Sequence, residues 1–170
     1  MWFIRLSAAL LLACVATACN QVDLKTAFEI TELSSGYHDA GVTDTGDNKL
    51  VPSISFRMKN VSAEPIRSVD MVVFFWSVEF EQPKELDEVI ITVINSDGLA
   101  PGATSDMVVV RSKQGFALQQ QARSELFKHR LFRDSTAKLF LKRAGKLVAF
   151  GEYTIDRRVL LAAPTESASR

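Results

Sequence analysis

The alternation of apolar and polar residues is the feature that most constrains how this chain can fold. From Pro52 to Lys59, apolar side chains occupy the even positions, and serine, arginine or lysine occupies each odd position. A β-strand points successive side chains to opposite faces, so this pattern predicts a strand with one buried and one solvated face. Phe56 lies on the even parity, and we therefore expect it in the core.

Several further segments predict strands, and they differ in how many of their faces are buried. Residues 22–30 alternate in the same way. Residues 66–80 carry apolar side chains on both parities, which indicates a central strand covered on both faces. We expect Phe74, Phe75 and Trp76 in the core. Shorter apolar runs predict four more strands, at residues 89–94, 107–110, 137–142 and 147–155.

Two segments between these strands have a different character. Residues 34–49 are rich in glycine, aspartate, threonine and asparagine, which predicts a long loop. Within residues 115–134, Leu118, Ala122 and Leu126 recur at helical spacing. This second pattern predicts one short amphipathic helix that packs against the strands.

Together these elements predict a mainly β fold, an immunoglobulin-like antiparallel β-sandwich of about seven strands with one short helix. No helical pattern separates successive strands, which argues against a parallel α/β sheet. The expected organisation is a signal peptide at residues 1–18, an anchor with the first strand and the long loop at residues 19–49, the main body of the sandwich at residues 50–160, and a disordered tail at residues 161–170.

The first residues of the chain predict export. Arg5 precedes an uncharged apolar run, residues 6–18, that ends in Ala16-Thr17-Ala18. This is the charge, length and small-residue pattern of a secretory signal, and the run is too short to span a bilayer. A cysteine, Cys19, follows directly, and the whole segment resembles the lipobox signal of bacterial lipoproteins.

The lipobox resemblance implies cleavage before Cys19, acylation of Cys19 and a lipid anchor in the bacterial cell envelope. Asn20 in the next position implies the outer membrane, with the protein facing the periplasm. Cys14 matches the motif better because a leucine lies three residues before it, but its apolar run would be only about seven residues long. We expect lipidation at Cys19. Cys14, an ordinary cleaved signal peptide and an uncleaved amino-terminal anchor are the alternatives.

Two short patterns add a second resemblance. Residues 56–66 contain Asn60-Val61-Ser62 between two expected strands, and residues 98–106 contain a leucine, a proline and a glycine in a turn. Together they resemble the immunoglobulin-like domains of bacterial envelope proteins, including FxLYD-type modules. The resemblance concerns residues 50–110 and implies a fold rather than an activity.

The charge of the chain balances overall but is divided between its two parts. Residues 20–110 contain 15 acidic and 6 basic residues, whereas residues 111–170 contain 13 basic and 5 acidic residues. Four bases in and after the expected helix form a candidate interaction face: Arg123, Lys128, Arg130 and Arg133. Such a face would meet acidic envelope proteins or anionic lipid headgroups, unless the two parts interleave in space and their charges cancel. No combination of aromatic and basic residues predicts nucleic-acid binding.

The residues that carry chemistry in enzymes and metal sites form no recognisable set. Ser135 and Lys138 have the spacing of an acylating serine motif, but that motif needs a helix, and Lys138 sits in an alternating strand. Residues 44–46 spell the Asp-Thr-Gly of aspartic proteases without its apolar flanks. The two histidines, His38 and His129, are too few for a zinc site, and no cysteine follows Cys19. We expect no catalytic residue, metal or cofactor.

These expectations combine into one functional hypothesis. The chain is expected to be a membrane-anchored periplasmic lipoprotein that acts as a non-enzymatic binding or interaction module. An accessory subunit of an envelope transport or assembly complex is one alternative, and a hydrolytic enzyme is another, although no nucleophile and base can be paired from the sequence.

Overall fold

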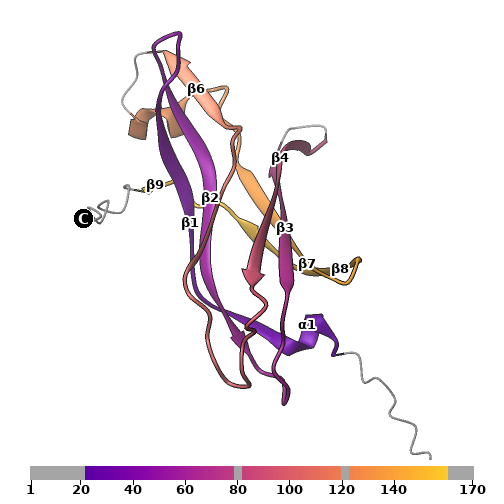
Figure 1. The fold of residues 1–170 in the computed structure, drawn as a ribbon. Coiled ribbons are helices and arrows are strands. Elements are labelled where there is room, and N and C mark those ends of the chain that lie inside the picture. Colours follow the sequence, from indigo (N-terminus) through magenta and orange to yellow (C-terminus); the bar gives the residue numbers. More distant parts are fainter. Residues whose placement is uncertain (1–21, 79–81, 120–122, 161–170) are drawn as a thin grey trace, which may run out of the picture.

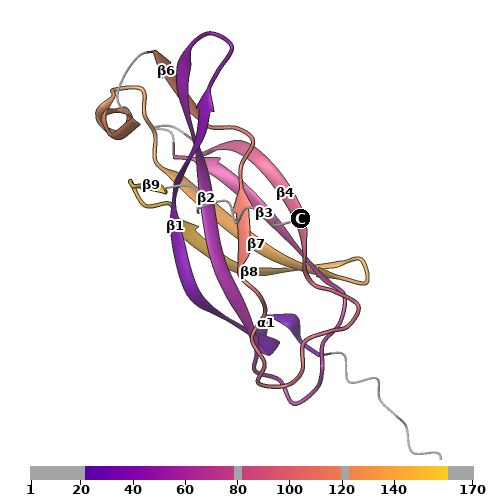
Figure 2. The same ribbon diagram turned by 60° about the vertical axis from the view of Figure 1, so that its left-hand side comes forward.

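The computed structural model describes residues 22–78, 82–119 and 123–160, and these form a sandwich of two β-sheets (Figures 1 and 2). One sheet contains β1 (Phe28–Val42), β2 (Asp47–Asn60), β5 (Val108–Arg111), β6 (Phe116–Gln119) and β9 (Val159–Leu160). The other contains β3 (Val69–Ser77), β4 (Lys84–Ile94), β7 (Ser135–Arg143) and β8 (Lys146–Thr154). A short helix, α1 (Leu24–Ala27), precedes β1, and a 3-10 helix, η1 (Arg123–Lys128), precedes β7. The mainly β sandwich is confirmed, with nine strands in the described part of the chain rather than about seven.

The two long sides of the sandwich differ. The strand orders are β5-β2-β1-β9 and β4-β3-β7-β8, and β6 also pairs with β2. On one side the chain crosses from β8 to β9, where the Ser35 hydroxyl accepts the main-chain N–H of Asp156 and the Ser35 carbonyl accepts Arg158 Nε at 2.7 Å. On the other side, β4 and β5 are edge strands of facing sheets. The sandwich is therefore closed along β8 and β9 and open along β4 and β5.

The long axis of the body follows β1, which is fifteen residues long. At about 3.3 Å per residue this strand spans roughly 45 Å. It pairs with β2 from Phe28↔Asn60 beside α1 to Val42↔Asn48 at the far tip. The prediction of a loop at residues 34–49 is therefore wrong, since only residues 43–46 form a turn. Main-chain hydrogen bonds between the two strands order the polar residues of this hairpin. Amino-acid composition carries no information about such pairing.

The first expected strand begins later than the alternation indicated. Asp23 caps α1 by accepting the main-chain N–H of Lys25 through its carboxylate. Leu24 and Ala27 are buried under the sandwich because residues three apart share one face of a helix. Over a few residues the same apolar spacing fits either a helix turn or a strand, so only β1 from Phe28 onward matches the prediction.

Strand β3 is central in its sheet, as expected, but its buried parity is the odd one. Phe75 is fully buried, as is Phe56 on β2. Phe74 and Trp76 are half-buried on the outer face of the sheet, where the Phe74 ring meets Phe140 at a centroid distance of 5.6 Å. The expectation that Phe74 and Trp76 belong to the core is wrong. Both parities of this strand are apolar, so the sequence does not say which face is inward.

The short helix expected within residues 115–134 is present as the 3-10 helix η1, but β6 and a turn take up the rest of that range. Gly115 lies so close to β2 that an added Cβ would come within 2.1 Å of the Leu50 carbonyl oxygen, so the backbones pack directly there. β6 then pairs with residues 47–50, and this pairing overrides the helical preference of the local sequence. Leu126 is fully buried, as predicted. The Leu118 side chain and Ala122 lie outside the described residues.

Asn60, at the end of β2, joins the two loops that carried the second sequence resemblance. Its buried amide group donates to the carbonyl oxygens of Glu64 and Leu99 at 2.9 and 2.8 Å. Its side-chain oxygen accepts the main-chain N–H and the hydroxyl of Ser62. Its main-chain groups pair with Ala103 and Gly102. Each donor and acceptor of Asn60 is therefore satisfied, and the β2–β3 and β4–β5 loops are fixed to each other.

We expect Asn60→Ala to lower the free energy of unfolding by roughly 2–4 kcal/mol, because it leaves buried carbonyl and N–H groups without partners. Asn60→Asp keeps the volume but places a carboxylate against two carbonyl oxygens, so it should be similarly severe. Urea denaturation measures both. Asn95→Ala is the matched control, because Asn95 accepts main-chain N–H groups in an exposed turn, and its cost should stay below about 1 kcal/mol. Equal costs at both asparagines would contradict the structural role of Asn60.

Candidate functional site

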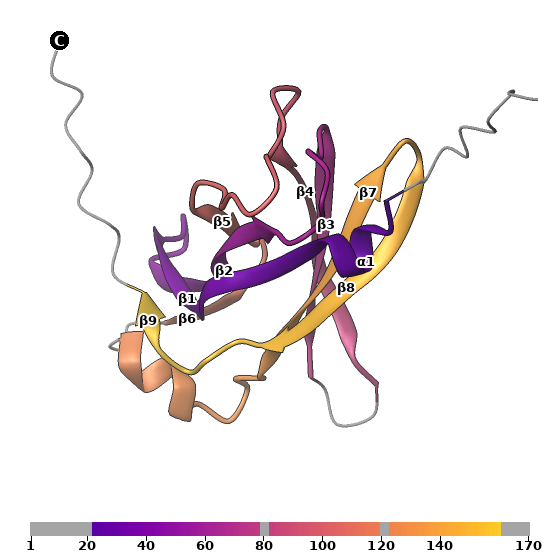
Figure 3. The ribbon, with the colours of Figure 1, turned by 90° about the horizontal axis from the view of Figure 1, so that it is seen from below.

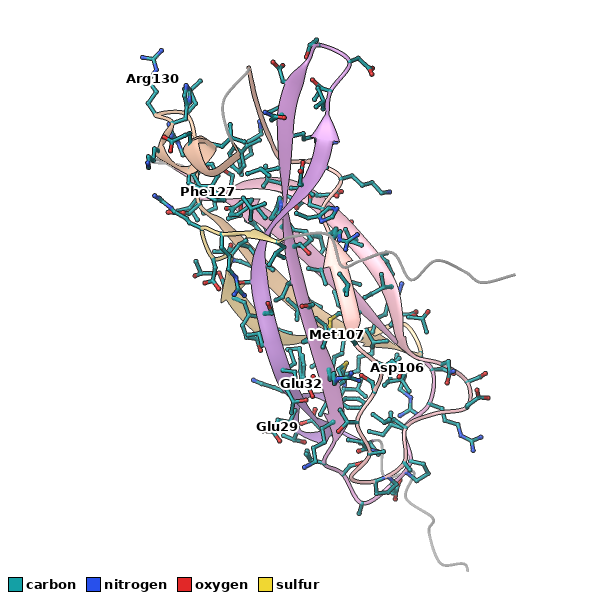
Figure 4. All side chains as sticks on the ribbon, turned by 90° about the vertical axis from the view of Figure 1, so that its left-hand side faces the viewer. Glu29, Glu32, Asp106, Met107, Phe127 and Arg130 are labelled. Carbon is teal, nitrogen blue, oxygen red and sulfur yellow. The ribbon has the colours of Figure 1, made fainter. Side chains whose placement is uncertain are left out.

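The structure divides the basic carboxyl-terminal part of the chain between two separate surfaces. Arg123, Lys128, Arg130 and Arg133 lie in η1 and the turn after it, whereas Lys142, Arg143 and Lys146 lie at the β7–β8 turn. Strand β7 separates the two groups and is nine residues long, so they are roughly 25–30 Å apart. We call the first group the distal segment, residues 123–133, and the second the basic hairpin, residues 142–147. Figure 4 places Arg130 and Phe127 toward the end of the body opposite Glu29 and Glu32, which follow α1.

A cluster of aromatic rings holds the distal segment to the sandwich. The Tyr37 ring of β1 contacts Phe127 and Phe132, each at a centroid distance of 5.3 Å. Phe116 of β6 completes the cluster at 4.7 Å from Phe132. Burial raises the pKa of Tyr37 to about 12, so its hydroxyl stays protonated at physiological pH. Aromatic contacts of this kind add stability beyond the area that they bury, and they give the distal segment a rigid base.

The bases of the distal segment have different surroundings. The Arg133 guanidinium donates to the carbonyl oxygens of Arg130 and Phe132 at 2.7 and 2.9 Å, so this side chain stabilises the turn. Lys128 is 75% exposed and forms an ion pair of 3.0 Å with Glu125. Arg130 is exposed beside Leu131, an apolar side chain that is itself 57% exposed. The side chain of Arg123 is not described. Arg133 is therefore half-buried against its own turn, whereas Lys128 and Arg130 are exposed and available to a partner.

A second ion pair fixes the segment where it joins β7. Arg157 donates to both carboxylate oxygens of Asp134, at 2.7 and 2.8 Å, and its guanidinium lies 5.6 Å from the centre of the Phe132 ring. These hydrogen bonds hold the pKa of the Asp134 carboxyl below its usual range. No local sequence pattern predicts this pair, because its members are 23 residues apart and only the packing of the β8–β9 connection brings them together.

The open side of the sandwich carries a cleft of about 560 Å³ between β4 and β5. Ile91, Val93 and Val108 contribute apolar side chains to it, and the exposed residues Asp106 and Met107 stand on its rim (Figure 4). An uncharged stretch of β4, residues 89–94, runs along the cleft with one edge unpaired to any described strand. Such an edge can accept apolar side chains or the main chain of an added strand. The apolar runs of the sequence predict these two strands, but they carry no information on which strands lie at the sheet edges.

At one end of the cleft a side chain joins the two sheets. The Asp87 carboxylate of β4 accepts the Ser112 hydroxyl at 3.2 Å, and the same oxygen accepts the main-chain N–H of Lys113. The two facing edges are therefore held together near the distal end and separate toward the end that carries α1.

The residues considered for enzymatic chemistry lie apart. Ser135 is fully buried toward the core, whereas Lys138 is on the opposite face of β7, with Nζ 3.7 Å from Glu152 and 5.5 Å from the centre of the Trp76 ring. Residues 44–46 form the exposed turn of the β1–β2 hairpin. Among the described residues, no group of three or more histidine, cysteine, aspartate or glutamate side chains could hold a metal ion.

The candidate lipidation residues, Cys19 and Cys14, lie outside the described residues. Val22 is the first described residue, and it leads directly into α1. Within residues 22–78, 82–119 and 123–160, no helix is long and apolar enough to cross a membrane.

Comparisons with known proteins assign no family. No family model matches the chain, and no curated protein matches it. Among solved structures, it is similar to a β-glucuronidase of Bacteroides uniformis at 11% identity and a TM-score of 0.43, over 72% of this chain and 12% of that one. It is also similar to a Northeast Structural Genomics Consortium target, at 12% identity and 0.40, over 87% and 96% of the two chains. A protein from Akkermansia muciniphila matches at 12% identity and 0.40, over 77% and 70%. Likenesses at these scores indicate neither a family nor an activity, and the chain spans only about an eighth of the glucuronidase.

We expect Asp134→Asn to lower the melting temperature at neutral pH, because it removes the carboxylate that Arg157 binds with both of its donors. The pKa of Asp134 is lower in the folded state than in the unfolded state, so the stabilisation is present above the unfolded pKa and is lost as the pH falls through the folded pKa. The difference from wild type should therefore shrink below about pH 4. Thermal denaturation between pH 2 and 7 measures it.

Glu125→Gln is the matched control, since Glu125 accepts a single hydrogen bond from Lys128, without the two-point contact that Asp134 makes with Arg157, and should contribute little. A wild-type-like melting curve for Asp134→Asn at pH 7 would show that the pair does not fix the distal segment.

Proposed function

We propose that this protein is a lipid-anchored, non-enzymatic interaction module of the bacterial cell envelope, held to the membrane through Cys19. One observation supports the proposal most directly. The end of the body that follows the lipobox-like segment and the end that carries the exposed bases Lys128 and Arg130 are opposite ends of a long sandwich. A module of this shape can be tethered at one end and bind at the other.

The tether to the membrane would be short. Three residue steps separate Cys19 from Val22, and a fully extended chain covers about 10 Å in that distance. An acylated Cys19 would therefore hold α1 within roughly one helix diameter of the headgroups. β1 leads away from α1 for roughly 45 Å, so an upright body would present its distal segment to the periplasm.

The distal surface fits an acidic protein partner better than the anchoring membrane. Lys128 and Arg130 supply positive charge, and Leu131 supplies an exposed apolar contact beside them. Charges of this kind steer association and set its specificity. In an upright body they are several Debye lengths from the anchoring headgroups at physiological ionic strength. We infer that the partner is an acidic envelope protein, as expected for an accessory subunit of a transport or assembly complex.

The resemblance to FxLYD-type modules is part of the proposal as well. The two segments that carried it, residues 56–66 and 98–106, are in direct contact through Asn60 and through the Ile66↔Leu99 bridge. This contact supports a shared loop arrangement, and it says nothing about activity.

Metabolic labelling with a fatty-acid analogue tests the anchor. We expect the wild-type chain and Cys14→Ser to be labelled and Cys19→Ser to lose the label, because an apolar run of thirteen residues suits cleavage before Cys19. Label that survives in Cys19→Ser and disappears in Cys14→Ser would move the anchor to Cys14. Label that survives in the double variant, Cys14→Ser with Cys19→Ser, would rule out lipidation at either cysteine.

Photocrosslinking in cells tests the distal surface. A photoreactive residue at position 131 should give a protein adduct that Lys128→Glu with Arg130→Glu abolishes, because the reversed charges repel an acidic partner. High salt should weaken the adduct in the unreversed chain. The same residue at Val109, which is also exposed but lies on β5, is the positional control and should not depend on those charges. An adduct at position 131 that survives the reversal would contradict the proposed docking.

A further inference from the structure

We propose that the basic hairpin, residues 142–147, is a membrane contact that binds anionic headgroups of the bilayer in which the lipid anchor is inserted. The inference rests on the proposed lipid anchor at Cys19. It assigns a role to a surface that sequence reasoning had not separated from the distal segment, and it determines how the body is oriented on the membrane.

The hairpin gathers positive charge around an exposed tip. Ala144 and Gly145 both have positive φ, 48° and 78°, which makes the tight two-residue turn that suits the twist of a β-hairpin. Arg143 and Lys146 flank this turn as cross-strand partners. Lys142 is opposite Leu147, which is 48% exposed. Arg143 and Lys146 lie on one face of the hairpin and Lys142 and Leu147 on the other, so three bases and an apolar side chain gather around one protruding tip.

Few acids offset this charge. Asp70 of β3 is the register partner of Lys142, and its carboxylate accepts the Thr92 hydroxyl at 2.8 Å. In the part of the chain that the structure describes, the Arg143 and Lys146 side chains form no ion pair. Their charges remain available to an external anion. A bilayer surface that contains phosphatidylglycerol is a broad anionic partner of this kind, and clustered bases bind such surfaces.

The position of the hairpin matches that of the anchor. α1 contacts β8, and Figure 3 shows α1 beside the β7 and β8 strands when the body is viewed from below. The chain enters α1 at Val22, so the 21 residues before it, which include Cys19, join the body on this side. A lipid on Cys19 would therefore bring the hairpin close to the headgroups, whereas the distal segment lies a β7 length farther away.

The other loops at this end fit an anionic surface less well. The β2–β3 loop carries Glu64 and Arg67, whose charges offset each other, whereas the β4–β5 loop carries the exposed acids Asp97 and Asp106. Anionic headgroups attract the hairpin and repel the acids of the β4–β5 loop, so the body should tilt toward β7 and β8. Each basic residue near such a surface strengthens binding by roughly fivefold. The three bases can therefore select one orientation of an already anchored body.

Fluorophore quenching on the lipidated protein tests the inference. The proposed lipid occupies the thiol of Cys19, and no cysteine follows it in the sequence, so a single added cysteine can be labelled selectively. We would label Ala144→Cys at the hairpin tip and, in a second protein, Leu131→Cys in the distal segment. Both proteins would be reconstituted in vesicles of phosphatidylethanolamine and phosphatidylglycerol that contain a headgroup-linked quencher. Quenching should be at least about threefold greater at position 144 than at position 131, and it should fall in 0.5 M salt or in neutral phosphatidylcholine vesicles.

Two matched charge reversals show whether the bases cause the contact. Arg143→Glu with Lys146→Glu should reduce quenching at position 144 to about the level at position 131, whereas Lys128→Glu with Arg130→Glu, which changes the net charge equally, should leave it unchanged. Circular dichroism and the melting temperature check that both variants fold. Should the hairpin reversal unfold the protein, neutral vesicles and high salt still test the contact in the unreversed chain.

Flotation with the vesicles is read separately, so that the two proposals can fail separately. Protein that floats but shows equal quenching at the two positions would overturn the hairpin contact and leave the anchor standing. Stronger quenching at position 131 would overturn it in favour of a body lying on its distal segment. Protein that does not float would overturn the anchor and, with it, the hairpin contact.

Discussion

The hydrogen bonds of Asn60 are the interaction on which the arrangement of the two sheets most depends. A buried primary amide needs hydrogen-bond partners for its two N–H donors and for its oxygen. Leaving one of these groups unpaired destabilises the fold by more than a formed hydrogen bond stabilises it. Asn60 meets this requirement by reaching across the sandwich from the end of β2 to the loop that follows β4. The loop before β3 and the loop before β5 are therefore fixed at the same point, and the facing sheets keep one relative position at the end that carries α1.

Away from Asn60, different contacts form along the two long sides of the sandwich. Ser35 and Arg158 close one side, where the chain passes from β8 to β9. Asp87 joins β4 to the end of β5 on the other side and leaves a cleft beyond it. The same asymmetry separates the bases. Because β7 runs the length of its sheet, residues that are close in sequence emerge on surfaces roughly 25–30 Å apart. We propose the distal segment as the contact for an acidic protein partner and the basic hairpin as the contact for the membrane.

Alternation at residues 52–59 predicted both the strand and its buried parity, because all of its apolar side chains lie on one face of the strand. The both-sided apolar pattern around Phe74 predicted a central strand correctly, but it placed Phe74 inward, whereas the inward parity proved to be that of Phe75. Composition failed at residues 34–49, where main-chain pairing orders polar residues. Helical spacing failed at residues 116–119, where Gly115 allows β6 to pair with β2.

The sequence by itself determined a mainly β sandwich and the inward position of Phe56, because each depends on local pattern. Of the candidate site, it determined the presence of bases in the carboxyl-terminal part of the chain. Only the tertiary structure decided that Arg133 is bound to main-chain carbonyls while Arg130 is exposed, and that Arg143 and Lys146 lie on the side of α1. The physical reason is that strand pairing joins residues far apart in the chain. The groups that surround a charged side chain therefore come from other strands, and the residues next to it in the sequence do not reveal which strands these are.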